Sequence, residues 1–166
     1  MSKVGRAAYS ASRARLELVT ADKTISKNES GELYLVFAGE DPLTITLPSD
    51  AEEGTRYSFW IPVAPGADII LSSPGAPGST GAYFGGAVSF ADGGGAGVGV
   101  VDQVVTMLTG PENTLTIQDD AEPGSWIDCV YVTAQALDSP TGIWFVCGFI
   151  SGIDPPVFTD ESPTIP

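Results

Sequence analysis

A strand-turn-strand phrase that occurs twice in the chain constrains its fold more than any other feature. The first copy spans residues 43–61 and begins with Leu43, Ile45 and Leu47 alternating with threonine. Successive side chains of a strand point to opposite faces, so this alternation predicts a half-buried strand. An acidic turn that ends at Gly54 follows, and the next run is rich in the aromatic residues that suit a second strand.

The phrase returns in the second half of the chain. Residues 120–124 differ from residues 50–54 at a single position, and both segments follow a Leu-Thr-Ile run. Each acidic turn joins an alternating strand to a strand that contains aromatic residues. We interpret the two copies as related β-hairpins, with a general similarity among antiparallel β proteins as the alternative.

The remaining sequence has the same local character. About eight to ten short alternating or apolar runs, separated by turn residues, follow one another along the chain. The 20 glycines and 13 prolines are typical of a globular protein with many turns. Helical periodicity is absent, so nothing supplies the crossover helices of a parallel βαβ fold. The sequence therefore predicts an all-β fold, either an antiparallel β-sandwich or a jelly-roll-like barrel.

The predicted domain carries an extension at each end. Residues 1–14 are small, polar and basic and are expected to form an extended N-terminal arm, followed by the β-sandwich domain at 15–153. Residues 154–166 hold four of the 13 prolines and predict an extended, Pro-rich C-terminal tail. Within the domain, the Gly- and Pro-rich residues 73–99 predict a loop insertion.

Charge is distributed unevenly along the chain. The 21 acidic and 7 basic residues give a net charge of −14, and six of the basic residues lie between Lys3 and Lys27. An acidic body argues against nucleic-acid binding, which requires Lys and Arg opposite the phosphates. The basic N-terminal region is expected to contact an acidic partner or the acidic body of a neighbouring subunit, with a merely solvated terminus as the alternative.

The sequence also bears on the compartment in which the chain is made. It has neither an apolar segment of signal-peptide type nor an apolar run long enough to span a membrane, so we expect a cytosolic origin and no membrane contact. Cys129 and Cys147 are too few for a disulfide framework, and their spacing is not that of a metal site. We interpret both as small buried hydrophobic residues, although adjacent strands could bring them together.

The residue types present do not favour an enzyme. The chain has no histidine, which removes the commonest general base and metal ligand. Two acidic clusters could be read as glycosidase carboxylates or weak calcium sites, but both occupy turns, where acids are usually solvated. These clusters are Asp50, Glu52 and Glu53, and Asp119, Asp120 and Glu122. We therefore expect no enzymatic activity, no cofactor and no bound metal.

Two further motifs have a functional and a structural interpretation. The glycine run at 93–99 lacks the Gly-Lys-Ser/Thr that follows in a phosphate-binding loop, so a nucleotide site is not expected. Trp60, Trp126 and Trp144 could form a platform on which sugar rings stack. Each has alternating apolar neighbours, however, which favours core or interface packing.

Several of these segments together resemble a pattern found in β-rich virion proteins of tailed bacteriophages. The matching segments are Ile45-Thr-Leu-Pro48, Glu53-Gly54, Tyr57-Ser-Phe-Trp-Ile61, Asp68-Ile-Ile-Leu71, Gly124-Ser-Trp-Ile127 and Gly142-Ile-Trp-Phe-Val-Cys-Gly148. Head decoration (cement) proteins, head fibres and tail-fibre or spike domains use related phrases. The resemblance implies a structural virion protein without catalytic residues, often trimeric and seated on a capsid or at a fibre tip.

Within this group, a short chain without a long repetitive shaft favours a capsid decoration protein. We expect it to bind the outer surface of a phage capsid and stabilise the shell, on virions assembled in the host bacterial cytoplasm. The expected partners are the major capsid protein and other copies of the chain in a homotrimer. The residues expected to contact the capsid are Lys3, Arg6, Tyr9, Arg13 and Arg15. The alternative is a receptor- or glycan-binding fibre or spike domain that uses residues 73–99 and the tryptophans.

Overall fold

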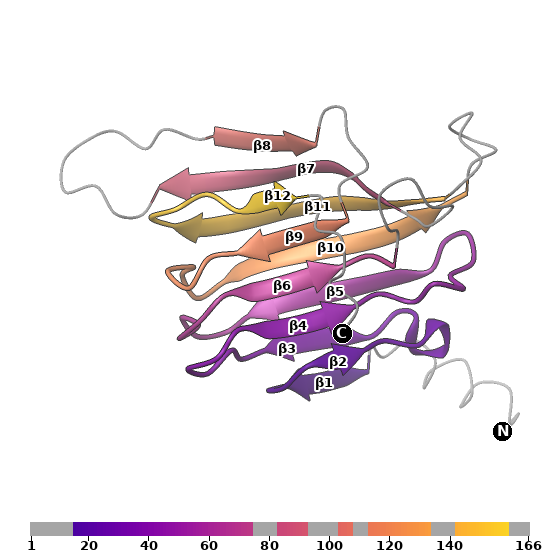
Figure 1. Cartoon of the computed structure of the whole chain (residues 1–166), viewed down its shortest axis with the longest axis horizontal. Helices are drawn as coiled ribbons and strands as arrows, with labels where there is room; N and C mark the ends of the chain where they lie inside the picture. The colour runs from indigo at the N-terminus through magenta and orange to yellow at the C-terminus, as the bar shows by residue number, and fades with distance from the viewer. Residues whose placement is uncertain (1–14, 75–82, 93–102, 108–112, 134–141, 160–166) are drawn as a thin grey trace, which may run out of the picture.

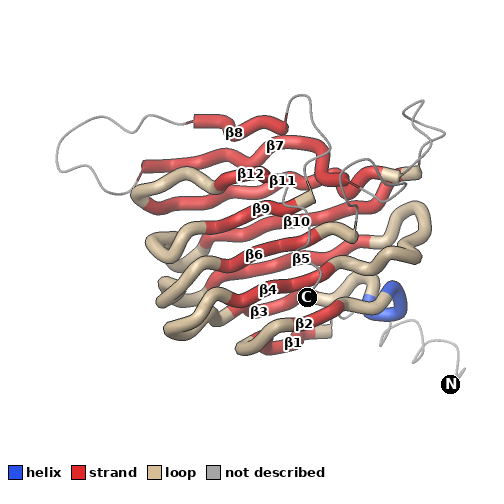
Figure 2. The backbone as a smooth tube through the Cα atoms, in the orientation of Figure 1, coloured by secondary structure: helices blue, strands red, loops and turns tan. Residues whose placement is uncertain are grey.

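The structure is a computed structural model that describes residues 15–74, 83–92, 103–107, 113–133 and 142–159. Strands dominate these residues, and a single 3-10 turn, η1 (Lys27–Glu29), is the only helical element among them (Figure 2). The strands are β1 (Leu16–Val19), β2 (Lys23–Thr24), β3 (Leu33–Val36), β4 (Leu43–Thr46), β5 (Arg56–Ile61), β6 (Ile69–Ser72), β7 (Tyr83–Asp92), β8 (Gln103–Met107), β9 (Thr114–Ile117), β10 (Ser125–Val132), β11 (Ile143–Gly152) and β12 (Val157–Thr159). The predicted all-β class is confirmed for this part of the chain, in which no helix is long and apolar enough to cross a bilayer.

The strands form two sheets that lie one over the other (Figure 1). The seven-stranded sheet has the order β1-β3-β5-β10-β11-β7-β8, and the five-stranded sheet has the order β12-β9-β6-β4-β2. Buried side chains from both sheets belong to a single hydrophobic cluster, so the core lies between the two layers. Tyr34 stacks on Phe59 in this core with ring centroids 5.4 Å apart. The ring centroids of Trp144 and Tyr131 are 5.2 Å apart.

Both sheets are mixed, which corrects the expectation of an antiparallel sandwich. From β1 to β6 the chain changes sheet at every strand, so β1, β3 and β5 become parallel neighbours in one sheet. In the other sheet β2, β4 and β6 are parallel in the same way. Between two parallel neighbours of one sheet, the chain passes through a strand of the opposite sheet, so no crossover helix is needed. Alternation in sequence reports which face a residue occupies and carries no information about the direction of the neighbouring strand.

The repeated phrase forms two turns between the sheets rather than two hairpins. β4 belongs to the five-stranded sheet and β5 to the seven-stranded sheet, and β9 and β10 are divided in the same way. The interpretation as hairpins was therefore wrong. Hairpin turns and turns between sheets both require a residue that adopts positive φ, so the turn chemistry alone does not distinguish them.

The two turns are nevertheless structural equivalents. Gly54 and Gly124 have φ angles of 83° and 96°, which glycine adopts without steric cost. The Gly54 N–H donates to the Tyr131 carbonyl at 2.9 Å, and the Gly124 N–H donates to the Ile61 carbonyl at 2.8 Å. The two glycines are 70 positions apart in the sequence (124 − 54 = 70), and so are Ile61 and Tyr131. The turn at Gly54 therefore bonds the strand that follows Gly124, and the turn at Gly124 bonds the strand that follows Gly54. The sequence repeat is thus a repeat of structure, centred on the antiparallel pair β5 and β10.

The cysteines lie on neighbouring strands but point to opposite faces. Cys129 is opposite Val146, and Cys147 is opposite Asp128, so their positions are offset by one residue. Cys129 is buried in the core, whereas Cys147 is exposed on the outer face, and both are free thiols. The interpretation of Cys147 as a buried residue was therefore wrong.

The predicted extensions and insertion lie partly outside the described residues. The arm at 1–14 and residues 160–166 of the tail are outside them, together with most of the insertion at 73–99. Within the insertion, β7 is a ten-residue strand that pairs in parallel with β11 along its whole length. At the start of the tail, β12 pairs with β9 at the edge of the five-stranded sheet.

Candidate interaction surface

On five strands of the seven-stranded sheet, the outer face carries mostly apolar side chains. On β5, Tyr57, Phe59 and Ile61 point into the core, so the residues between them point outward. The same alternation on the neighbouring strands aligns one outward row across five strands. This row is Leu18, Leu35, Trp60, Trp126 and Phe149. We call the outward side of β1, β3, β5, β10 and β11 the apolar face.

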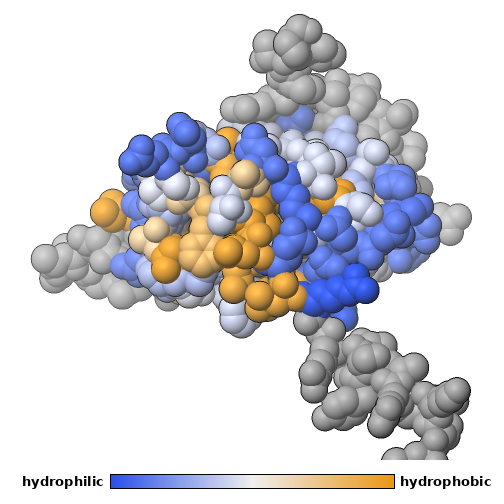
Figure 3. All heavy atoms as spheres, turned by 90° about the horizontal axis from the view of Figure 1, so that it is seen from below, coloured by the Kyte–Doolittle hydropathy of each residue, from blue (hydrophilic) through white to orange (hydrophobic). Residues whose placement is uncertain are grey.

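Several large side chains of the apolar face are open to solvent. Leu18 is 56 % exposed, Trp60 52 % and Phe145 52 %. Seen from the side on which β1 lies in Figure 1, the surface has a connected apolar area next to strongly hydrophilic ones (Figure 3). Contiguous exposed apolar area of this kind marks interaction sites, because monomeric proteins usually avoid it.

The outer face of the five-stranded sheet is very different. Its outward positions on β4, β6 and β9 carry mostly hydroxyl groups, on Thr44, Thr46, Ser72 and Thr116, with Ile70 among them. We call this side the threonine face. It matches an ordinary sheet that meets the core on one side and water on the other. The same chain builds both faces, so the exposed apolar side chains are particular to the apolar face and are not a general feature of its two sheets.

Two opposite charges stand within the apolar face. Its outward strand positions include one basic residue, Arg56 on β5, and one acidic residue, Asp128 on β10. They are diagonal neighbours, because Arg56 is opposite Val130 and Asp128 is opposite Ser58. Within the described part of the chain, neither side chain forms a hydrogen bond or an ion pair, so both are available to a partner.

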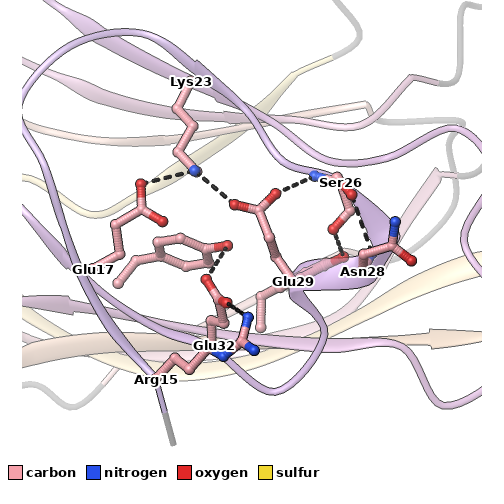
Figure 4. Close-up of polar contacts among 9 residues, drawn as sticks. Arg15, Glu17, Lys23, Ser26, Asn28, Glu29 and Glu32 are labelled. Carbon is pink, nitrogen blue, oxygen red and sulfur yellow. Dashed lines mark hydrogen bonds and ion pairs between the residues drawn. The ribbon is translucent and has the colours of Figure 1, made fainter.

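A second cluster of charges lies at the end of the molecule where β1, β2 and η1 meet (Figure 4). Lys23 Nζ lies 2.8 Å from Glu17 Oε1 and 2.8 Å from Glu29 Oε1, which ties β2 to β1 and η1. Arg15 Nη1 lies 3.3 Å from Glu32 Oε1. Glu17, Glu29 and Glu32 are the only group of acidic residues in the described chain close enough to share a metal ion. The Lys23 ammonium already bonds two of these carboxylates, so the cluster is a structural ion-pair network.

The network makes stability depend on pH. Burial alone would raise the pKa of Glu29, but the Lys23 ammonium and the Ser26 N–H outweigh it and lower that pKa. A carboxyl group with a lowered pKa stabilises the fold above its ordinary pKa, and this contribution is lost as the pH falls through the lowered value.

Replacing Glu29 with glutamine tests this contribution. Glutamine can still accept the Ser26 N–H in the capping box, so the change removes mainly the charge opposite Lys23. We expect the free energy of unfolding at neutral pH to fall by up to about 1 kcal/mol. The difference from the unmodified protein should shrink as the pH is lowered, which urea denaturation at several pH values will measure. A constant difference at every pH would contradict the assignment.

The structure describes one of the five residues expected to contact the capsid. The Arg15 side chain is 80 % exposed and pairs with Glu32 on its own chain. Lys3, Arg6, Tyr9 and Arg13 lie outside the described residues.

Both acidic turns have structural partners. Lys27 lies 3.2 Å from Asp50 Oδ2 and 3.3 Å from Glu52 Oε1. Asp120 Oδ2 accepts the N–H groups of Ile153 and Asp154 at 2.6 and 2.7 Å. These carboxylates therefore hold turns in place, and neither turn gathers three acids around one point within the described chain.

The three tryptophans divide between the core and the surface. Trp144 is fully buried, whereas Trp60 and Trp126 lie opposite each other on the apolar face. Sequence reasoning missed the apolar face because its residues look like those of a core strand. The outward Leu33 and Leu35 of β3, for example, belong to a run that is apolar on both sides.

No protein-family model, no curated protein and no solved structure matches this chain. The class is therefore defined by the fold and its surfaces: a β protein of two mixed sheets, with a polar outer face on one sheet and an apolar outer face on the other.

Proposed function

We propose that the chain is a structural protein that works by attachment to other protein subunits, and that the apolar face is an attachment surface. The observation that carries this proposal is the row from Leu18 to Phe149, which continues across five strands without a charged residue. Removing such a row from water contributes about 25 cal/mol for each Å² of apolar surface buried, from which the costs of association are subtracted. A sheet face with an apolar row across five strands suits a protein surface better than a small substrate.

The particular role that we propose is that of a capsid decoration protein on the virion of a tailed bacteriophage. The support for this role is the resemblance of the strand and turn segments to β-rich virion proteins, together with an interaction surface on a two-sheet fold. The major capsid protein is the proposed partner, and the basic residues at 1–14 are proposed to contact it. A protein that binds only the assembled lattice stabilises the shell by mass action. The virion surface would then be its location, after assembly in the host cytoplasm.

Sedimentation with capsid shells tests the proposal. Undecorated shells of the phage that encodes the chain would be mixed with the full protein, with a chain that starts at Arg15, and with Trp60→Glu. We expect the full protein to sediment with the shells and both altered proteins to be lost from the pellet. Thr116→Glu, which adds the same charge to the threonine face, is the matched control and should bind like the full protein. If Trp60→Glu binds as well as this control, the apolar face is not an attachment surface.

A receptor- or glycan-binding fibre domain is the second candidate. It is favoured by Trp60 and Trp126, which present two aromatic side chains side by side on an exposed sheet. Aromatic rings of this kind stack on sugar rings. A glycan array would favour this function if it gave a specific signal that Trp126→Ala abolishes, and an array without any signal would count against it.

A further inference from the structure

We propose that the apolar face binds the same face of a second copy of this chain, which gives a dimer with two-fold symmetry. The inference rests on the proposed function in one respect, namely that this face is a protein interface. It adds the occupant of this face, a second copy of the chain, and leaves the basic residues at 1–14 to contact the capsid. A contact between two identical faces must be self-complementary, so that each residue finds on the other copy a group that fits it.

The charges of the apolar face meet this condition. Arg56 and Asp128 are the only charged residues at its outward strand positions, and they have opposite signs. Burying either one without a partner would be costly, because a charge removed from water needs a counter-charge. In a face-to-face pair, Arg56 of each copy can meet Asp128 of the other, so the same ion pair forms twice in the contact and every charge has a counter-charge. A partner of different sequence would have to supply this pairing independently.

The relief of the face is also self-complementary. Three smaller side chains, Ser58, Asp128 and Cys147, lie in one short row across β5, β10 and β11, which ends at Leu33 on β3. The row that contains Trp60, Trp126 and Phe149 lies on one side of it, and Val130 and Phe145 lie on the other. A face with alternating large and small rows can receive the large row of another copy in its own small row. Two sheets with apolar facing sides pack about 10 Å apart in this manner in the cores of β-sandwiches.

The monomer leaves these groups unused. Diagonal neighbours on adjacent strands are about 7–8 Å apart, which long side chains can bridge. Arg56 and Asp128 nevertheless form no ion pair with each other. The free thiol of Cys147 lies in the same small row, and burial followed by the Asp128 charge raises its pKa. Cys147 is the only cysteine exposed on the surface, so its reactivity reports whether this face is covered.

The native mass is the first test. Light scattering on the full chain at increasing concentration is expected to approach twice the 17.2 kDa of one chain. Trp60→Glu should halve the mass, and the matched control Thr116→Glu should leave it unchanged. The Cys147 thiol should react with a thiol reagent more slowly in the dimer than in Trp60→Glu. Circular dichroism of each variant will show that the fold is retained.

The decisive test uses the two charges, because it gives a result that only a second copy can give. Arg56→Asp carries two acids on the face and Asp128→Arg carries two bases, so each variant alone is expected to be monomeric. When the two variants are mixed in equal amounts, each base of one chain meets an acid of the other, and the dimer mass should return. Both substitutions lie on the outer face of the sheet, and return of the dimer mass on mixing would show that each variant is folded.

Each possible result decides between the two proposals. A monomer at every concentration overturns the second copy as partner, but leaves the proposed function standing if Trp60→Glu still fails to sediment with capsid shells. If that variant also sediments like the Thr116→Glu control, both proposals fail. A trimeric mass, or single charge variants that remain dimeric, would overturn the two-fold pairing. A monomer that binds a sugar through Trp60 would assign the face to a glycan instead.

Discussion

Replacing Trp144 with alanine is expected to lower the free energy of unfolding by about 3–5 kcal/mol. Trp144 is the largest fully buried side chain, and its ring centroid lies 5.7 Å from that of Tyr57 and 5.2 Å from that of Tyr131. Alanine would leave a cavity that β11 cannot close without losing its pairing with β10 and β7. Since small domains are stable by about 5–15 kcal/mol, the variant should unfold at much lower urea concentration or fail to fold.

Trp144→Phe separates the two properties of this side chain. Within the described part of the chain the buried indole Nε1–H has no hydrogen-bond acceptor, so phenylalanine removes an unsatisfied donor while keeping most of the ring contacts. We expect it to cost much less stability than alanine, as measured by the midpoint and slope of urea denaturation. Equal losses for the two variants would mean that the indole N–H contributes a bond that the structure does not contain.

Trp144 and Trp60 also mark the limit of what the sequence can predict. Both stand in strand-like apolar runs, in which successive side chains point to opposite faces. The sequence could not tell which face is the inner one when both faces are apolar, as on β11, where Trp144 is buried and Phe145 is 52 % exposed. The apolar face therefore became visible only when the strands were assembled into a sheet.

The pairing of the strands could not be predicted from the local sequence either. β4 and β5 are adjacent in the chain, and the turn between them has the residues of a hairpin, yet each pairs within a different sheet. Which sheet a strand joins depends on distant segments, such as the packing of β10 beside β5 and of β9 beside β6. The sequence repeat was detectable because Gly54 and Gly124 need the same backbone conformation. The sequence did not reveal that each of these turns carries the chain from one sheet to the other.

Replacing Gly86 with alanine is expected to lower the free energy of unfolding by about 2–5 kcal/mol. Gly86 lies on β7 opposite Val146, with a φ angle of 118° that side chains rarely adopt. An added Cβ would lie 2.1 Å from the Val146 carbonyl oxygen, which is backbone and cannot rotate away. The alanine variant must therefore either strain both strands or separate β7 from β11.

Gly54→Ala is the matched control, because it has a positive φ of 83° but nothing within 4 Å of an added Cβ. It should cost only the conformational strain, about 1–2 kcal/mol. Urea denaturation of both variants will give the difference, and amide hydrogen exchange will show whether β7 and β11 lose protection together. If the two variants are equally destabilised, β7 can shift away from β11 at little cost and is a loosely attached part of the insertion. If Gly86→Ala costs more, the strand within the predicted loop insertion is an integral part of the sheet that presents the apolar face.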